Sequence, residues 1–152
     1  MATPNGSLSE LLAEGAIRLD AAASSRPEAI RLVGRLLVEC GAVTEEYIDG
    51  MLARDESVST WVGEGIAFPH GTLASKDAVL RDAIAVARFP GGVEWGGERV
   101  QVAVGIAARG RGHIRLLSRL ATVLVEPAAA ARLRDARDED EVRALLAAPE
   151  TL

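Results

Sequence analysis

The segment from Val100 to Ile106 constrains the fold of this chain most, because it has the clearest strand pattern in the sequence. Apolar β-branched residues occupy every second position, at Val100, Val102, Val104 and Ile106. Such alternation is typical of a β-strand, whose side chains point to opposite faces in turn. The pair Gly96-Gly97 just before it indicates a tight hairpin turn that leads back to a short strand over residues 93–95. The chain must therefore build a sheet.

Further strands and helices are predicted on both sides of this segment. The other strands are expected at residues 16–19, as a short edge strand, at 65–68 and at 83–89. We interpret Pro90-Gly91-Gly92 as a turn and residues 57–64 as a polar loop. The apolar periodicity and the capping signals predict five helices. The first begins at Ser24 or Ser25 and ends at Gly41, and the second begins at Thr44 and ends near Arg54. The third runs from about His113 to Val125, the fourth starts at Pro127, and the fifth starts at Asp138 and stops at Pro149.

Helices therefore precede, interrupt and follow a set of short strands. This order predicts an α/β fold: a single three-layer domain with a mixed, mostly parallel sheet of about five strands and helices on both faces. The length of 152 residues fits one domain of ordinary size.

Composition excludes several classes of protein. The single cysteine, Cys40, cannot form an intramolecular disulfide, which fits a reducing cytoplasm. The net charge of −5 and the aromatic content of 3% argue against a nucleic-acid partner. The first 14 residues lack the basic start of a signal peptide, and no apolar run approaches the roughly 20 residues that span a bilayer. We expect a cytoplasmic protein with no direct membrane insertion.

The only two histidines follow predicted strands. His70 lies between Pro69 and Gly71, where the proline fixes its own φ and the glycine lets the chain turn and leaves the ring open to a partner. His113 begins the helix after the strand at 100–106. If the strands before the two histidines are parallel, both rings lie at the same carboxyl edge of the sheet. A solvated loop histidine is the plain alternative, and a zinc site would need three or four ligands.

This arrangement suits phosphoryl transfer. An imidazole nitrogen is a good nucleophile near neutral pH, and the reaction needs positioning and charge stabilisation more than acid–base chemistry. The N–H groups of residues 110–113 at a helix start can hold an anion, and they disfavour a proton on His113. Arg54 could add a cation, or it could be an ordinary surface arginine.

The stretch Gly65-Ile66-Ala67-Phe68-Pro69-His70-Gly71-Thr72 resembles the phosphorylation motif of a known family. This family comprises the enzyme IIA domains of the mannitol–fructose class in the phosphoenolpyruvate-dependent sugar phosphotransferase system (PTS EIIA type 2). The resemblance extends over residues 8–148, which would form the phosphocarrier domain between a flexible N-terminus at 1–7 and a C-terminal end at 149–152. The segments at 71–77, 90–95 and 105–109 are closer to the mannitol branch than to the others.

The resemblance implies a role for each matched residue. His70 would accept a phosphoryl group on Nε2 from the phosphorylated histidine phosphocarrier protein (HPr), forming a tele-phosphohistidine. His113 would hydrogen-bond and orient that group, and Arg54 would stabilise its charge. No metal or cofactor is implied.

The resemblance also implies partners. The next acceptor would be a cysteine of an enzyme IIB domain, working with a membrane enzyme IIC, both expected as separate proteins. The alternative is a fructose-type or nitrogen-regulatory enzyme IIA that acts as a phosphorylation-dependent interaction module. A docking rim could include Trp61, Val62, Phe68 and Leu73, although each could equally belong to the core.

Overall fold

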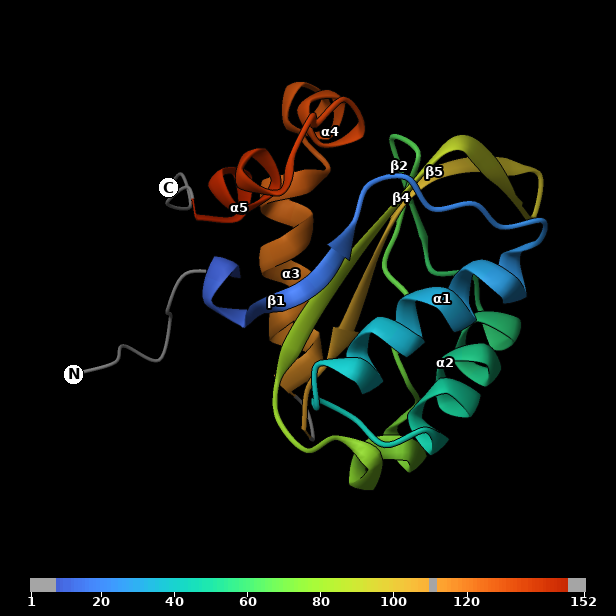
Figure 1. The fold of residues 1–152 in the computed structure, drawn as a ribbon. Helices are drawn as coiled ribbons and strands as arrows, with labels where there is room; N and C mark the ends of the chain where they lie inside the picture. Colours follow the sequence, from blue (N-terminus) through green and yellow to red (C-terminus); the bar gives the residue numbers. More distant parts are fainter. Residues whose placement is uncertain (1–7, 110–111, 148–152) are drawn as a thin grey trace.

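A five-stranded mixed sheet forms the centre of the molecule (Figure 1). The computed structural model describes residues 8–109 and 112–147, and the side chain of His113 lies outside the described part. The strand order is β1-β4-β5-β3-β2. The strands are β1 (Leu12–Arg18), β2 (Trp61–Gly63), β3 (Ile66–Ala67), β4 (Ala83–Trp95) and β5 (Glu98–Ala107).

The predicted α/β class and five-stranded mixed sheet are confirmed, but the sheet is not mostly parallel. The pairs β1–β4 and β3–β5 are parallel, whereas β4–β5 and β2–β3 are antiparallel. The antiparallel character comes from the tight hairpin at Gly96-Gly97, which joins the two longest strands and has positive φ at both glycines. The predicted edge position of β1 is confirmed, and residues 57–64, expected to be a loop, contain the short strand β2.

The expected turn at Pro90-Gly91-Gly92 is wrong, because β4 runs through it without a break. Arg88 faces Val102 and Val93 faces Val100, so four residues of β4 lie opposite one residue of β5. Proline cannot donate a ladder hydrogen bond, and Gly92 adopts a positive φ of 76°. The segment is therefore a bulge within one strand, and Val93 rejoins the ladder.

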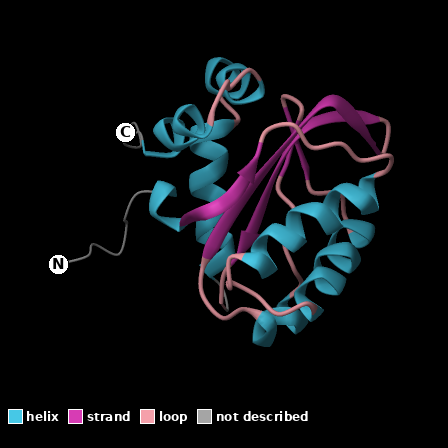
Figure 2. Cartoon of the chain, in the orientation of Figure 1, coloured by secondary structure: helices cyan, strands magenta, loops and turns pink. Residues whose placement is uncertain are grey.

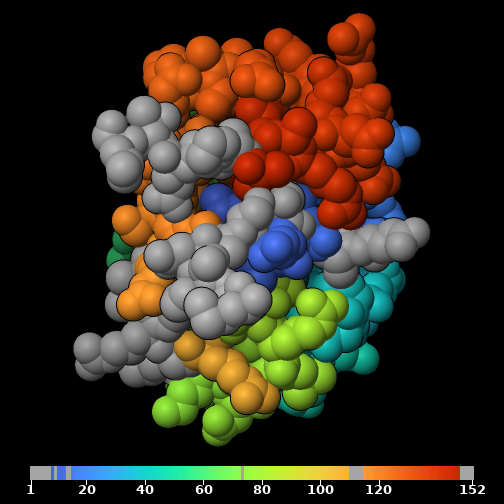
Figure 3. Space-filling model, turned by 90° about the vertical axis from the view of Figure 1, so that its left-hand side faces the viewer, coloured from blue at the N-terminus to red at the C-terminus, as the bar shows by residue number. Residues whose placement is uncertain are grey.

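Helices cover both faces of the sheet, as predicted (Figures 1 and 2). The helices α1 and α2 lie on one face, and α3, α4 and α5 lie on the other. The bounds are α1 (Arg26–Glu39), α2 (Glu46–Ser57), α3 (Gly112–Leu124), α4 (Pro127–Arg134) and α5 (Glu139–Ala147), with short 3-10 turns η1 (Leu8–Leu11) and η2 (Leu73–Ala78). In the space-filling view of Figure 3, η1 lies against α5, and its Leu8 is buried in the core on that side.

The two faces of β5 differ in side-chain size. Val102, Val104 and Ile106 point into the core with α3, α4 and α5, whereas Ala103 points toward α1. A Cβ placed on Gly105 would lie 2.5 Å from Cγ1 of Val33, so α1 sits directly on the small residues of β5. The alternation that predicted the strand thus also decides which helices pack closest to the sheet.

The helix starts show which capping predictions hold. Ser25 caps α1, since its Oγ accepts the N–H of Glu28 at 3.3 Å. Thr44 does not cap α2: its hydroxyl donates to the Glu46 carboxylate at 2.7 Å, and the helix extends to Ser57, beyond the expected end. The Asp138 carboxylate accepts the N–H of Glu141 at the start of α5, as predicted. Pro149 lies outside the described residues.

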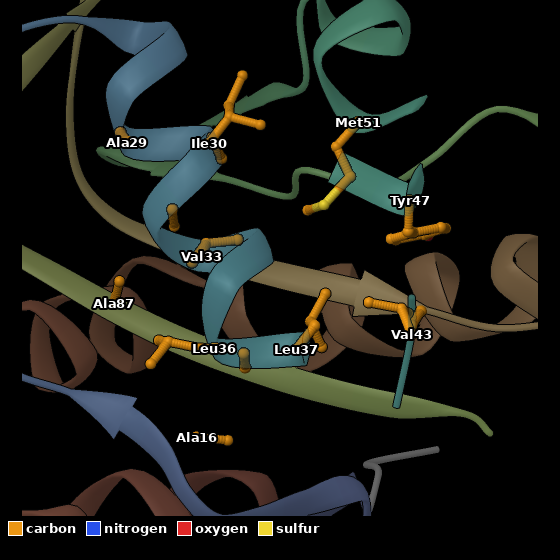
Figure 4. Packing of buried hydrophobic residues seen from close by; sticks show 14 of the residues in the cluster. Ala16, Ala29, Ile30, Val33, Leu36, Leu37, Val43, Tyr47, Met51 and Ala87 are labelled. Atoms are coloured by element: carbon orange, nitrogen blue, oxygen red, sulfur yellow. The ribbon is translucent and has the colours of Figure 1, made fainter. Parts of the chain in front are cut away.

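Figure 4 shows how α1 and α2 meet the sheet. Ile30, Val33 and Leu37 of α1 and Met51 and Tyr47 of α2 gather over β4 and β5, and all five are buried. Over residues 8–109 and 112–147, no helix is both long and apolar enough to cross a membrane.

Candidate functional site

The two histidines follow strands that end at one edge of the sheet, as predicted. The short strand β3, which leads to His70, runs parallel to β5, which leads to α3 and His113. His70 itself forms an isolated parallel bridge to Ile106, and the Ile106 N–H donates to the Pro69 carbonyl at 2.9 Å. His113 occupies the first turn of α3, and the orientation of its ring lies outside the described part of the chain.

The His70 ring is buried rather than open, which corrects the expectation from the sequence. The residue is only 5% exposed. Its backbone continues the β3 ladder toward Ile106 instead of leaving the sheet in a loop, so the residue stays within the sheet edge.

One hydrogen bond defines the protonation of the His70 ring. Nδ1 lies 2.8 Å from the carbonyl oxygen of Phe68. A carbonyl oxygen can only accept, so Nδ1 carries the proton and donates it. In the neutral ring, Nε2 is then the nitrogen with the lone pair, and its position is fixed by the backbone carbonyl of Phe68, the residue after β3.

Tyr47 of α2 joins the segment after His70 to β5. Its hydroxyl accepts the N–H of Gly71 at 2.8 Å and donates to the carbonyl of Ile106 at 2.7 Å. Burial raises the pKa of the Tyr47 phenol to about 12, even though the Gly71 N–H acts to lower it. Tyr47 was not among the predicted site residues, although a lone tyrosine in a chain with few aromatics was a usable signal.

Gly71 is needed for close packing and not for an unusual backbone conformation. Its φ is not positive, whereas an added Cβ would lie 2.5 Å from both the Tyr47 ring and the Ser75 hydroxyl. Gly50 of α2 meets Ser75 at the same distance. The Ser75 hydroxyl donates to the Thr72 carbonyl at 2.7 Å. The turn after His70 is thus pressed against α2, which corrects the idea that Gly71 provides a sharp turn.

Arg54 lies near the end of α2 and is partly buried. Its guanidinium donates to the carbonyl of Val58 at 2.7 Å. Two residues after Val58, the Thr60 carbonyl accepts the N–H of Phe68, so the segment that follows Arg54 runs beside Phe68, two residues before His70. The convergence of Arg54, His70 and His113 on one phosphate-sized pocket stays a prediction.

A buried carboxylate next to Arg54 organises the same segment, and the sequence analysis did not identify it. Asp55 is 3% exposed, and its Oδ1 accepts the Thr60 N–H at 2.9 Å and the Trp95 indole N–H at 3.1 Å. Its Oδ2 lies 3.1 Å from Nε of Arg26. These contacts fix the end of α2 against α1 and the β4–β5 hairpin. The contacts with Trp95 and Arg26 join residues far apart in sequence, so no local pattern indicated them.

The residues considered for a docking rim differ in their exposure to solvent. Trp61 is 38% exposed, whereas Phe68 is 1% exposed and belongs to the core with α3. Val62 is partly buried, and the Leu73 side chain lies outside the described part. Val58, beside Trp61, is exposed as well. Within residues 8–109 and 112–147, no group of three or more histidine, cysteine, aspartate or glutamate side chains could hold a metal ion.

Comparison with known proteins decides the family. Residues 10–148 match the model of the family described as "Phosphoenolpyruvate-dependent sugar phosphotransferase system, EIIA 2". The chain belongs to this family. The family that the segment at 65–72 resembles is thereby confirmed, and the match extends over nearly the whole chain.

Individual EIIA type 2 relatives support the assignment. The mannitol-specific phosphotransferase enzyme IIA component of Staphylococcus aureus (strain MRSA252) is 39% identical over 136 residues, which cover 90% of this chain and 94% of that protein. The multiphosphoryl transfer protein of Escherichia coli O157:H7 is 46% identical over 125 residues, or 82% of this chain. Those residues are 33% of that relative, so this chain spans about a third of its length.

A solved structure has the same fold. It is the complex of enzyme IIA-Mtl and phosphorylated enzyme IIB-Mtl from Escherichia coli, with a TM-score of 0.84 and 37% identity. The match covers 90% of this chain and 96% of that one. The arrangement of strands and helices described above is therefore that of an EIIA type 2 domain.

Proposed function

We propose that this chain is a phosphocarrier, the enzyme IIA component of a sugar phosphotransferase system, which accepts a phosphoryl group on Nε2 of His70 and passes it on. The observation that carries this proposal is the hydrogen bond from Nδ1 of His70 to the Phe68 carbonyl at 2.8 Å. It leaves the lone pair of the neutral ring on Nε2, which is the nitrogen that must attack phosphorus.

The proposed transfer of the phosphoryl group to His70 requires no proton transfer at that residue. The Nε2 lone pair forms the new bond to phosphorus, and the donor's phosphorus–nitrogen bond breaks, returning its electron pair to the donor ring. His70 keeps its Nδ1 proton on the Phe68 carbonyl. The phosphorylated ring then carries a formal positive charge, which makes it a good leaving group for the next transfer.

The partners follow from the family and from the relatives. The proposed donor is the phosphorylated histidine phosphocarrier protein HPr, and the proposed acceptor is a cysteine of an enzyme IIB domain that works with a membrane enzyme IIC. The Staphylococcus aureus relative and the solved complex with phosphorylated enzyme IIB both support a mannitol-type component. We place the carrier in the cytoplasm and assign the phosphocarrier domain to residues 8–148.

His113 and Arg54 are proposed to act on charge. The helix start of α3, which contains His113, follows β5 at the edge where His70 lies. The His113 ring would donate one hydrogen bond to the phosphoryl group. Arg54 would add positive charge from the end of α2.

Phosphorylation with defined components tests the proposal. The chain is incubated with phosphoenolpyruvate, enzyme I and HPr, and acid-labile phosphate on the chain is measured. The chain has two histidines, so His70→Ala and His113→Ala are reciprocal variants. We expect His70→Ala to abolish labelling, and His113→Ala to keep it while transfer to the IIB cysteine slows more than stability falls.

Three outcomes would each contradict a part of this scheme. Labelling that survives His70→Ala would exclude His70 as the acceptor. Equal losses of transfer rate and stability in His113→Ala would make that ring structural. A chain that is labelled but does not phosphorylate an enzyme IIB cysteine would favour the regulatory alternative, an interaction module.

A further inference from the structure

The ladder between the His70 segment and β5 has an unusual last rung. His70 and Ile106 form a parallel bridge, and the Ile106 N–H donates to the Pro69 carbonyl. In a regular parallel ladder, the Gly71 N–H would meet the Ile106 carbonyl next. Here the Tyr47 hydroxyl stands between those two groups and bonds both, at 2.8 Å and 2.7 Å.

The hydroxyl therefore acts as a spacer one residue after the phosphoryl acceptor. It satisfies a buried donor and a buried acceptor, and it links the Gly71 N–H to the Ile106 carbonyl of β5. The contact of the Tyr47 ring with Gly71 is equally tight, since any Cβ at that glycine would collide with it. Tyr47 of α2 thus determines both how far Gly71 lies from the helix and in which direction the chain continues after His70.

We propose that Tyr47 is a positioning residue for phosphoryl transfer: its hydroxyl fixes the backbone on the C-terminal side of His70, as the Phe68 carbonyl fixes the ring from the N-terminal side. The proposal rests on the proposed function of His70. Tyr47 is a positioning and not a catalytic residue, because its hydroxyl binds the backbone groups of Gly71 and Ile106 and acts on His70 through them. It acts by keeping Nε2 in line with the donor's phosphorus.

The effect is geometric and therefore concerns the rate of transfer once the donor is bound. Without the hydroxyl, the Gly71 N–H and the Ile106 carbonyl either lose their partners or close onto each other. Closing would draw the Gly71 end of the segment toward β5 and turn His70 with it. A shift of about 1 Å at a reacting centre can lower a rate by about a hundredfold.

The test is Tyr47→Phe, which keeps the aromatic ring and removes only the hydroxyl. Phosphoryl transfer from phosphorylated HPr is followed under single-turnover conditions over a range of donor concentrations. We expect the maximal rate to fall by roughly ten- to hundredfold, with little change in the donor concentration that gives half that rate. The ¹⁵N shifts of the His70 ring should move away from the pattern of an Nδ1-protonated tautomer, which a merely structural role would leave unchanged.

A stability-matched control separates positioning from folding. Val142 is buried in α5, in the core on the opposite face from Tyr47, and Val142→Ala also weakens the fold. It should leave the maximal rate and the His70 ¹⁵N shifts as in the unaltered chain. If Tyr47→Phe does the same, or if both variants lose rate equally, the positioning role is overturned. Failure of the unaltered chain to become labelled would instead overturn the proposed function.

Discussion

At the scale of single residues, main-chain neighbours hold the His70 ring, which is the proposed phosphoryl acceptor. Nδ1 of His70 donates to the carbonyl of Phe68, and the Pro69 carbonyl accepts from β5. Tyr47 then holds the next residue, Gly71. A buried histidine with these constraints has one tautomer and a narrow range of orientations, which is what repeated transfer between large partners requires.

The raised pKa of Tyr47 predicts a loss of stability at high pH. The folded pKa of about 12 lies above the ordinary value of 10.0, so the unfolded chain releases this proton first as the pH rises. The contribution of the neutral Tyr47 phenol to the free energy of unfolding is complete below pH 10 and is lost as the pH rises through about 12. The pKa difference corresponds to at most about 2–3 kcal/mol of that free energy. Denaturant unfolding between pH 9 and 12 measures it.

The same experiment has an internal control. Tyr47 is the only tyrosine, so the tyrosinate absorbance reports this one group. Tyr47→Phe should lack this part of the stability loss over the same pH range. An absorbance midpoint near the ordinary value would show that the phenol is not buried as described.

At the scale of elements, the site depends on how closely α1 and α2 approach the sheet. Glycines at 50, 71 and 105 all lie where an added Cβ would touch a neighbouring side chain within 2.5 Å. The buried carboxylate of Asp55 ties the end of α2 to Trp95 and to the Thr60 segment. The close fit of helix to sheet brings the Tyr47 hydroxyl within reach of both Gly71, which follows His70, and Ile106 of β5.

The contact between α1 and β5 predicts strong coupling between Gly105 and Val33. Gly105→Ala places a methyl group 2.5 Å from Cγ1 of Val33 and should destabilise the fold by about 1–3 kcal/mol. Val33→Ala should cost about 2 kcal/mol by leaving a cavity. The double variant should be more stable than the sum of the single effects by at least about 1 kcal/mol, as measured by denaturant unfolding. Simple additivity would mean that the methyl group is accommodated elsewhere.

At the scale of the whole molecule, one sheet separates two cores. Phe89 and Trp95 belong to the core with α1 and α2, whereas Ile84 and Leu120 belong to the core with α3 to α5. The strands β4 and β5 contribute to both cores through alternate residues. Neither core can lose its packing without exposing the shared strands, so the two should unfold together.

This shared sheet predicts a single unfolding transition. Trp95 is 1% exposed and lies in the core with α1 and α2, so its fluorescence reports on that core. The helices α3, α4 and α5 lie on the opposite face of the sheet and contribute to the circular dichroism signal from there. Tryptophan fluorescence and far-ultraviolet circular dichroism should give the same midpoint in urea. Two separate midpoints would indicate that the faces unfold independently.

The local features of this protein were determined by its sequence. The alternation at 100–106 predicted β5, Ser25 and Asp138 predicted two helix starts, and the segment at 65–72 predicted the family. Each of these depends on residues close together in the chain, where periodicity, capping and motif spacing are directly visible.

The tertiary structure alone decided the remainder. The continuous β4, the burial of His70 and the identity of the nitrogen that keeps the lone pair all depend on how strands pair. Tyr47 contacts Ile106 across 59 positions of sequence, and Asp55 contacts Trp95 across 40. Hydrogen bonds of this kind form only once the helices are packed on the sheet, because a donor and an acceptor far apart in sequence meet only when the fold brings them within about 3 Å.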